Sequence, residues 1–188
     1  MGNEGAVTGL LRRYNSGDRS AWEELIPILY EDLRRVARQR LRFDRKSQTL
    51  GTTALVNECY LRLVQNRDLG IEDRNAFLAA ASLTMRRVLV DYARTRNREK
   101  RGGGQESVPI QEVEEWLTLE EGEELLGLDE ALDRLRAMNG RAAQVIELRF
   151  FGGLSLDETA QVMEVSTTTV RRMWTAARAW LRKEMGVR

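Results

Sequence analysis

The final part of the chain, residues 154–182, places hydroxyl and guanidinium side chains at helical spacing. Six of these side chains would share one face of a helix: Thr167, Thr168, Arg171, Arg172, Thr175 and Arg178. No acidic residue interrupts this face. Such side chains can hydrogen-bond to base edges and bind phosphates when their helix lies in the major groove of DNA. The face therefore predicts nucleic-acid binding.

A pair of helices with a short turn is needed to position this face. Ser155 and Glu158 form a capping-box pattern that predicts a first helix over 156–163. Ser166 or Thr167 can cap the second helix, after a turn that begins at Glu164. Apolar residues line the other side of the second helix: Val170, Met173, Trp174, Ala177 and Leu181. This pattern predicts a helix-turn-helix; the alternative is an ordinary helical hairpin with a basic, solvated face.

The net charge of +1 conceals a strong segregation of charge along the chain. Residues 1–104 contain 20 Lys and Arg against 13 Asp and Glu. Residues 105–133 contain 11 acidic residues and no basic one, and residues 134–188 contain 10 basic and 5 acidic residues. Basic segments attract phosphate backbones, whereas nucleic acid repels the acidic segment.

The residue inventory argues against an enzyme. The chain has no histidine and one cysteine, so it lacks the commonest general base and the usual zinc ligands. No glycine-rich phosphate loop is present either, so we expect no catalytic residue, no metal and no cofactor. Cys59 is expected to be a core residue, and a lone cysteine fits a reducing cytoplasm. No apolar run reaches the roughly 20 residues of a membrane span.

Hydrophobic periodicity predicts helices throughout and no alternating strand, so the predicted class is all-α. One helix is expected from about residue 18 or 20 to 43, and Pro27 either kinks it or starts a new helix. The predicted organisation is a helical domain over 1–101, an acidic linker over 102–127 and a helix-turn-helix domain over 128–188. Composition leaves open whether the linker is a solvated spacer or forms a short helix.

Three stretches in this order carry a family resemblance: TALVNECYLRLVQ, MRRVLVDYARTRNREKRGGG and VIELRFFGGLSLDETAQVMEVSTTTVRRMWTAARAWLR. The chain resembles bacterial RNA polymerase sigma factors of the extracytoplasmic-function (ECF) type, in particular a planctomycete-like subgroup. The likeness covers residues 10–181. It implies a sigma region 2-like bundle and a sigma region 4-like helix-turn-helix, and promoter-specific transcription initiation without catalysis by the chain itself.

The resemblance assigns the N-terminal domain two surfaces. One would dock on the clamp helices of the β′ subunit of core RNA polymerase, through Val56, Asn57, Glu58, Leu61, Arg62 and Gln65. The other would recognise and help to melt the −10 promoter element, through Phe77, Arg86, Arg87, Asp91, Tyr92, Arg94 and Arg98. Relatives often carry asparagine at the position of Arg87.

The resemblance assigns the −35 element to the C-terminal domain. The contacting residues would be Arg149, Ser166, Thr167, Thr168, Thr169, Arg171, Arg172, Thr175 and Arg178, with Arg149 on a phosphate. The acidic linker would lie in the RNA-exit path of the polymerase. Glu164 replaces the usual turn glycine, so the turn either avoids positive φ or bears a strain of about 1 kcal/mol.

The implied partners are core polymerase, promoter DNA and, in some relatives, an anti-sigma or other regulatory protein. The alternative is a stand-alone helix-turn-helix regulator. Such a regulator needs a dimer face to bind two half-sites, and no spare apolar heptad is evident. It would also leave the acidic segment without a role.

Overall fold

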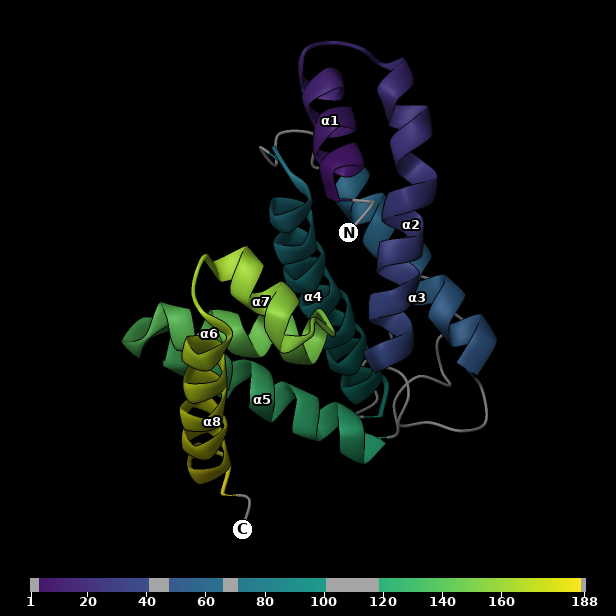
Figure 1. Cartoon of the computed structure of the whole chain (residues 1–188). Helices are drawn as coiled ribbons and strands as arrows, with labels where there is room; N and C mark the ends of the chain where they lie inside the picture. The colour runs from purple at the N-terminus through teal and green to yellow at the C-terminus, as the bar shows by residue number, and fades with distance from the viewer. Residues whose placement is uncertain (1–3, 41–47, 66–70, 101–118, 187–188) are drawn as a thin grey trace.

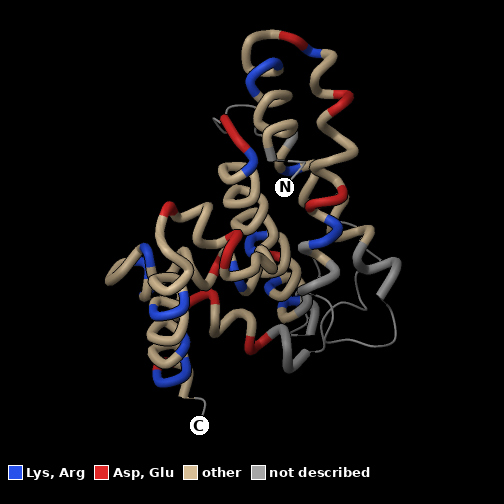
Figure 2. Tube along the Cα trace, in the orientation of Figure 1, with Lys and Arg blue, Asp and Glu red and all other residues tan. Residues whose placement is uncertain are grey.

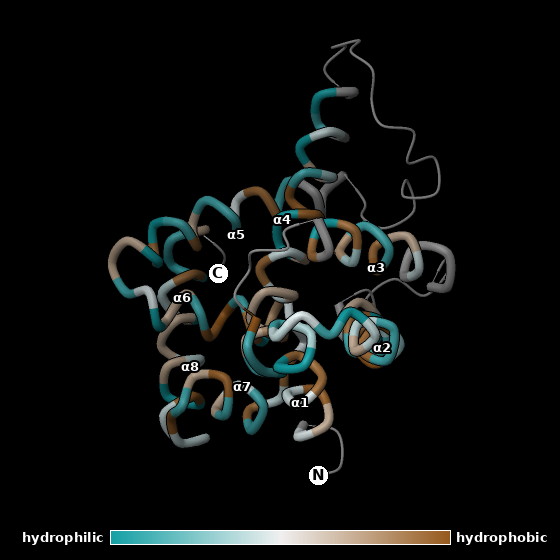
Figure 3. Tube along the Cα trace, turned by 90° about the horizontal axis from the view of Figure 1, so that it is seen from above, coloured by the Kyte–Doolittle hydropathy of each residue, from teal (hydrophilic) through white to brown (hydrophobic). Residues whose placement is uncertain are grey.

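The structure, a computed structural model, describes residues 4–40, 48–65, 71–100 and 119–186. Within these ranges the chain forms helices and turns, without a β-strand. The all-α class predicted from hydrophobic periodicity is therefore confirmed. The helices form two sets, and one long helix of the first set lies against the second set (Figures 1 and 3).

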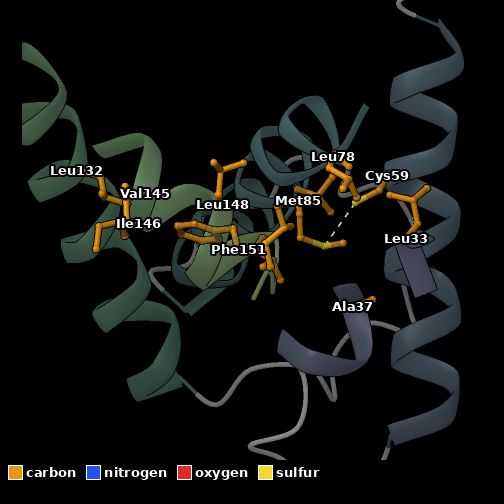
Figure 4. Close-up of a cluster of buried hydrophobic side chains, with 14 of the residues drawn as sticks. Leu33, Ala37, Cys59, Leu78, Met85, Leu132, Val145, Ile146, Leu148 and Phe151 are labelled. Carbon is orange, nitrogen blue, oxygen red and sulfur yellow. Dashed lines mark hydrogen bonds between the residues drawn. The ribbon is translucent and has the colours of Figure 1, made fainter. Parts of the chain in front are cut away.

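The first set comprises α1 (Glu4–Asn15), α2 (Ser20–Arg40), α3 (Gln48–Gln65) and α4 (Arg74–Lys100). Their apolar faces meet in a core that includes Leu25, Leu33 and Leu55, all fully buried. Cys59 belongs to this core, and its thiol lies 3.6 Å from the sulfur of Met85 (Figure 4). Burial raises the pKa of Cys59 to about 12, so the residue is the inert core residue that was expected.

Helix α3 begins at Gln48, upstream of the stretch TALVNECYLRLVQ. In α2 the structure decides between the two alternatives that the sequence left open at Pro27. Pro27 lies inside a continuous α2, so it does not start a new helix. A proline within a helix removes one backbone hydrogen bond, and fully buried Leu25 and Leu33 on either side hold this helix against the core.

The second set comprises α5 (Leu119–Met138), α6 (Gly140–Ile146), α7 (Leu156–Met163) and α8 (Thr167–Glu184). A single π-helical turn, η2 (Glu147–Phe151), continues α6. Helix α5 begins at Leu119, so the part of the predicted linker from 119 to 127 is helical. The remainder of that linker, 102–118, lies outside the described residues.

The two sets are packed against each other through α4, which contacts α5, η2 and α7. Leu78 and Met85 of α4 lie beside Leu148 and Phe151 of the second set, and all four are at most 1 % exposed (Figure 4). Buried apolar residues from both sets thus form one continuous core in the described part of the chain.

A glycine makes the closest approach between the sets possible. A Cβ atom built on Gly152 would overlap Ser82 Oγ of α4. Ser82 is buried and its hydroxyl donates to the carbonyl oxygen of Leu78, 2.7 Å away. The interface therefore has the tight complementarity of a protein interior.

Candidate nucleic-acid interface

Local capping builds the helix-turn-helix as the sequence predicted. Ser155 Oγ accepts from the Glu158 backbone N–H, and the Glu158 carboxylate accepts from the Ser155 N–H, which completes the capping box. Ser166 then caps α8 by accepting from the Thr169 N–H at 3.1 Å. Between the helices Glu164 has φ 53° and ψ 47°, so the turn takes the left-handed option. For a residue with a side chain this conformation costs about 1 kcal/mol or more.

The hydroxyls at the start of α8 are already engaged in holding this geometry. Thr167 Oγ1 donates to the Asp157 carboxylate of α7 at 3.0 Å, which ties the two helices together. The hydroxyls of Ser166 and Thr169 lie 2.8 Å apart and hydrogen-bond to each other. These three predicted DNA contacts therefore serve first to position the helix.

The outward face of α8 carries the remaining predicted contacts. Thr168, Arg171, Arg172, Thr175 and Arg178 are all exposed. Figure 2 shows blue basic positions recurring along this helix. The opposite face packs inward through Val170, Ala177 and Leu181. The amphipathic division inferred from the sequence is confirmed, and it leaves a rigid, basic surface open to solvent.

Two arginines share one aromatic ring beside this surface. The guanidinium carbons of Arg149 and Arg178 lie 4.6 and 5.4 Å from the centroid of the Trp174 ring. Arg149 Nε is buried and has no hydrogen-bond partner. Burial, together with the neighbouring charge of Arg178, lowers the pKa of Arg149. Two adjacent cations that stack on an aromatic ring, one with an unsatisfied donor, make a favourable place for an anion such as a phosphate.

Helix α4 differs from the prediction at two positions. Phe77 is 2 % exposed and belongs to the core, so its ring cannot contact DNA in this arrangement. Arg86 is 6 % exposed and lies in the interface between the two helix sets. Both residues lie on the helix where they were expected, but each side chain faces inward because other helices pack on that side of α4.

Arg86 is held there by carboxylates of the second helix set. Its guanidinium donates to Asp129 Oδ1 at 2.8 Å and to Glu147 Oε1 at 2.6 Å, and it also contacts Asp133 at 2.6 Å. Burial alone lowers the pKa of Arg86, but these hydrogen bonds raise it overall.

Arg94 and Arg136 complete this network. Arg94 donates to Asp129 Oδ2 at 3.1 Å, and Arg136 donates to Glu147. We call these six residues the interface ion cluster: Arg86, Arg94, Asp129, Asp133, Arg136 and Glu147. The cluster holds three positive and three negative charges, so its formal charges balance.

The other predicted residues of α4 lie toward solvent. Arg87, Asp91 and Arg98 are exposed, and Tyr92 is partly buried. Asp91 accepts from Arg62 of α3 at 2.7 Å. Arg98 Nε donates to the Arg94 carbonyl oxygen at 3.4 Å. Arg87, Arg94 and Arg98 thus form an exposed basic edge along the second half of the helix.

The predicted docking residues on α3 divide into exposed and buried groups. Leu61 is 51 % exposed, and Met138 is the other large apolar side chain exposed among the described residues. Asn57 is exposed and accepts from the Tyr30 hydroxyl, while Arg62 joins Glu58 to Asp91. Val56 is fully buried, so this residue supports α3 from the core and cannot form a docking contact in this arrangement. Gln65 is the last residue of α3.

Reasoning from sequence missed four functional candidates: Asp129, Asp133, Glu147 and Trp174. Asp129 and Asp133 lie four residues apart on one helix face, a spacing that could have signalled a partner for basic α4. Glu147 is an acid within an apolar run, which also predicts a buried pair. Trp174 was assigned only to the apolar face.

In the described residues no cluster of metal-ligating side chains occurs, and none of the described helices is long and apolar enough to cross a membrane.

Comparison with known proteins identifies the family of the chain. A search of curated proteins finds no significant match. The family model described as "ECF sigma factor" matches residues 4–187, nearly the whole chain. A stand-alone regulator is not favoured by a match of this extent. The chain belongs to the ECF sigma factor family, and it is a sigma factor that directs promoter-specific transcription.

Proposed function

We propose that this sigma factor uses three separate surfaces for its work. The exposed face of α8 binds the −35 element as duplex DNA, the basic edge of α4 binds near the −10 element, and the outer face of α3 docks on core polymerase. The observation that carries the proposal is the rigid, acid-free exposed face of α8.

On α8 the roles follow from what each side chain already binds. Thr168, Arg171, Arg172 and Thr175 are exposed and lie beyond the capping contacts, so they read base edges. Arg149 and Arg178, which share the Trp174 ring, bind a phosphate. Ser166, Thr167 and Thr169 set the angle of the helix, and the positive end of the helix dipole at this N-terminus favours a second phosphate.

On α4 the melted strand meets the exposed edge formed by Arg87, Arg94 and Arg98, with Asp91 and Tyr92 beside it. Arginine side chains bind phosphates and stack on unpaired bases, which suits a single strand. The phenyl ring of Phe77 and the guanidinium of Arg86 take no part, because both are buried.

On α3 the docking surface is centred on Leu61. Burial of the exposed Leu61 side chain by a partner would be favourable, because it would remove apolar surface from water. Asn57, Glu58 and Arg62 form the polar rim of this surface, and Gln65 follows them at the end of the helix. The acidic linker, whose residues 102–118 lie outside the described part of the chain, occupies the RNA-exit path of the polymerase, where its negative charge imitates that of RNA.

The proposal is tested by run-off transcription with purified core polymerase, with a gel shift of the chain alone in parallel. We expect specific transcripts only when core and chain are both present, and weak duplex binding by the chain alone. Strong, specific duplex binding by the free chain without any effect on core polymerase would contradict this assignment.

A further inference from the structure

We infer that Arg62 has a second task beside docking: it is a positioning residue that draws the Asp91 carboxylate away from Arg87 and so keeps the basic edge of α4 available to the melted strand. This role rests on the proposed function, because it concerns the edge assigned above to that strand. It differs from docking, because the contact that carries it is made with α4 and not with a partner protein.

Asp91 is an acid on an otherwise basic face. It is the only acidic residue of α4 between Arg74 and Arg98. Residues 87, 91, 94 and 98 are three or four positions apart, so their side chains follow one another along the helix. A carboxylate in this row would repel the phosphates of a bound strand, since salt at about 0.15 M screens charges only beyond about 8 Å. The edge therefore binds a strand better when the charge of Asp91 is neutralised.

Arg62 supplies this neutralisation from α3, which packs against α4. Its Nη1 donates to Asp91 Oδ2 at 2.7 Å. Its Nε donates to Glu58 Oε1, also at 2.7 Å, and Glu58 lies one turn earlier on α3. An acid four residues before a base is the favourable order for an ion pair on a helix. Glu58 thus fixes the guanidinium in the position in which it meets Asp91.

The spacing on α4 offers Asp91 two other partners. Arg87 precedes it by four residues and Arg94 follows it by three, and both spacings allow an ion pair. In the described part of the chain Asp91 pairs with neither of them, because its carboxylate is held by Arg62 and Arg94 donates to Asp129 at 3.1 Å. Arg87 is exposed. Without Arg62, Asp91 would turn to Arg87 and neutralise a cation that the strand needs.

A plain tie between α3 and α4 is the competing explanation of the same contact. Half-exposed ion pairs contribute little to stability, however, and the two helices already meet through buried side chains such as Cys59 and Met85. The two explanations predict different signs. Loss of either partner breaks a tie equally. If Arg62 positions Asp91, loss of Arg62 weakens strand binding, whereas loss of the Asp91 charge strengthens it.

The test uses the holoenzyme and a DNA duplex with an unpaired bubble at the −10 element of a promoter that the wild type transcribes. Core polymerase is supplied at a concentration that saturates each variant, because Arg62 also belongs to the docking rim. Fluorescence anisotropy then measures the affinity for the bubble. Arg62→Met should lower this affinity about tenfold, as expected for the loss of one charge-assisted contact. The magnitude of the salt slope should fall by about 0.7.

Asp91→Asn breaks the same hydrogen bond but should raise the affinity about twofold. The double variant Arg62→Met, Asp91→Asn should bind as Asp91→Asn does, because no carboxylate is left to occupy Arg87. Arg19→Met and Glu23→Gln are the charge-matched controls, since both residues are exposed and lie outside the three surfaces. Equal losses in the two single variants would show a structural tie. A double variant as weak as Arg62→Met would show that Arg62 itself binds the DNA. Either result overturns the inference.

A measurement on the free chain separates this inference from the proposed function. The NMR signal of the Arg87 Nε–H, assigned through Arg87→Lys, should shift in Arg62→Met, because Asp91 then pairs with Arg87. It should return in the double variant. An unmoved signal in Arg62→Met overturns the inference alone. Absence of specific transcripts from the wild-type holoenzyme, with a signal that shifts and returns, overturns the proposed function and leaves the exchange of partners supported.

Discussion

Replacement of Arg149 by methionine should weaken promoter binding while it stabilises the fold. In the free protein this guanidinium is stacked on Trp174, close to Arg178, and its Nε has no partner. A group in this position is poorly placed for stability and well placed for an incoming phosphate. The two effects of Arg149→Met therefore have opposite signs.

The change in stability follows from three contributions. Removal of a buried, unsatisfied donor is favourable by about 1–3 kcal/mol. Loss of the cation–π contact costs about 0.5–1 kcal/mol at a partly exposed site, and the contact of the methionine sulfur with Trp174 returns about 0.3–1.5 kcal/mol. We therefore expect the free energy of unfolding of Arg149→Met to rise by about 2 kcal/mol, measured by urea denaturation.

The change in binding follows from the loss of one phosphate contact. A charge-assisted hydrogen bond contributes about 1.5–3 kcal/mol, so affinity should fall by about tenfold or more. The slope of log K against log salt should decrease in magnitude by about 0.9. Fluorescence anisotropy of the holoenzyme on promoter DNA, between about 50 and 200 mM salt, measures both.

Lys183→Met is the matched control, because Lys183 is an exposed cation in the last turn of α8 and loses the same charge. Its effects on affinity and salt slope should be clearly smaller. If Arg149→Met lowers stability and leaves the salt slope unchanged, Arg149 is a structural cation and the reasoning is refuted.

Three other predictions concern single residues. Arg171→Ala should change which upstream element is preferred, by about 1–3 kcal/mol at one base pair. Arg178→Ala should lower the affinity for all upstream sequences by the same factor. Transcription from a randomised upstream element distinguishes the two outcomes. Leu61→Asp should reduce the affinity for core polymerase at least tenfold in a pull-down titration, and the midpoint of unfolding should stay unchanged. Normal affinity of this variant would exclude Leu61 from the docking surface. Burial opposes ionisation of Glu158, but its capping and ion-pair partners hold its pKa below 4.5. Because the folded-state pKa is depressed, its stabilising contribution is present above pH 4.5 and is lost as the pH falls through that lower value. Glu158→Gln should therefore flatten acid denaturation in this window, and an unchanged acid limb would show that the carboxylate is not stabilised by these partners.

Features that depend on neighbouring residues could be predicted from the sequence. The capping box at Ser155 and the bounds of α7 depend on contacts within a few positions, whereas at Glu164 the sequence left two conformations open and the structure shows the left-handed one. The burial of Cys59 followed from helical periodicity. Such interactions are short in range, so the residues that decide them are adjacent in the chain.

Features that depend on distant partners could not be predicted. Helix α5 and the π-helical turn at Glu147 both pack on α4, and the residue pattern of each segment fits more than one structure. The close approach of Gly152 to Ser82 joins positions far apart in the chain. Glycines at the end of a helical segment predicted only that the segment stops there.

The charged residues show this division most clearly. The sequence by itself determined the helices, the helix-turn-helix and the basic face of α8, because periodicity and caps act locally. Only the tertiary structure decided which arginines are available. Arg171 is exposed, whereas Arg86, in an equally basic stretch, is buried against Asp129 and Glu147. A guanidinium is drawn to whichever carboxylate the fold brings within hydrogen-bond distance, and no local pattern encodes that distance.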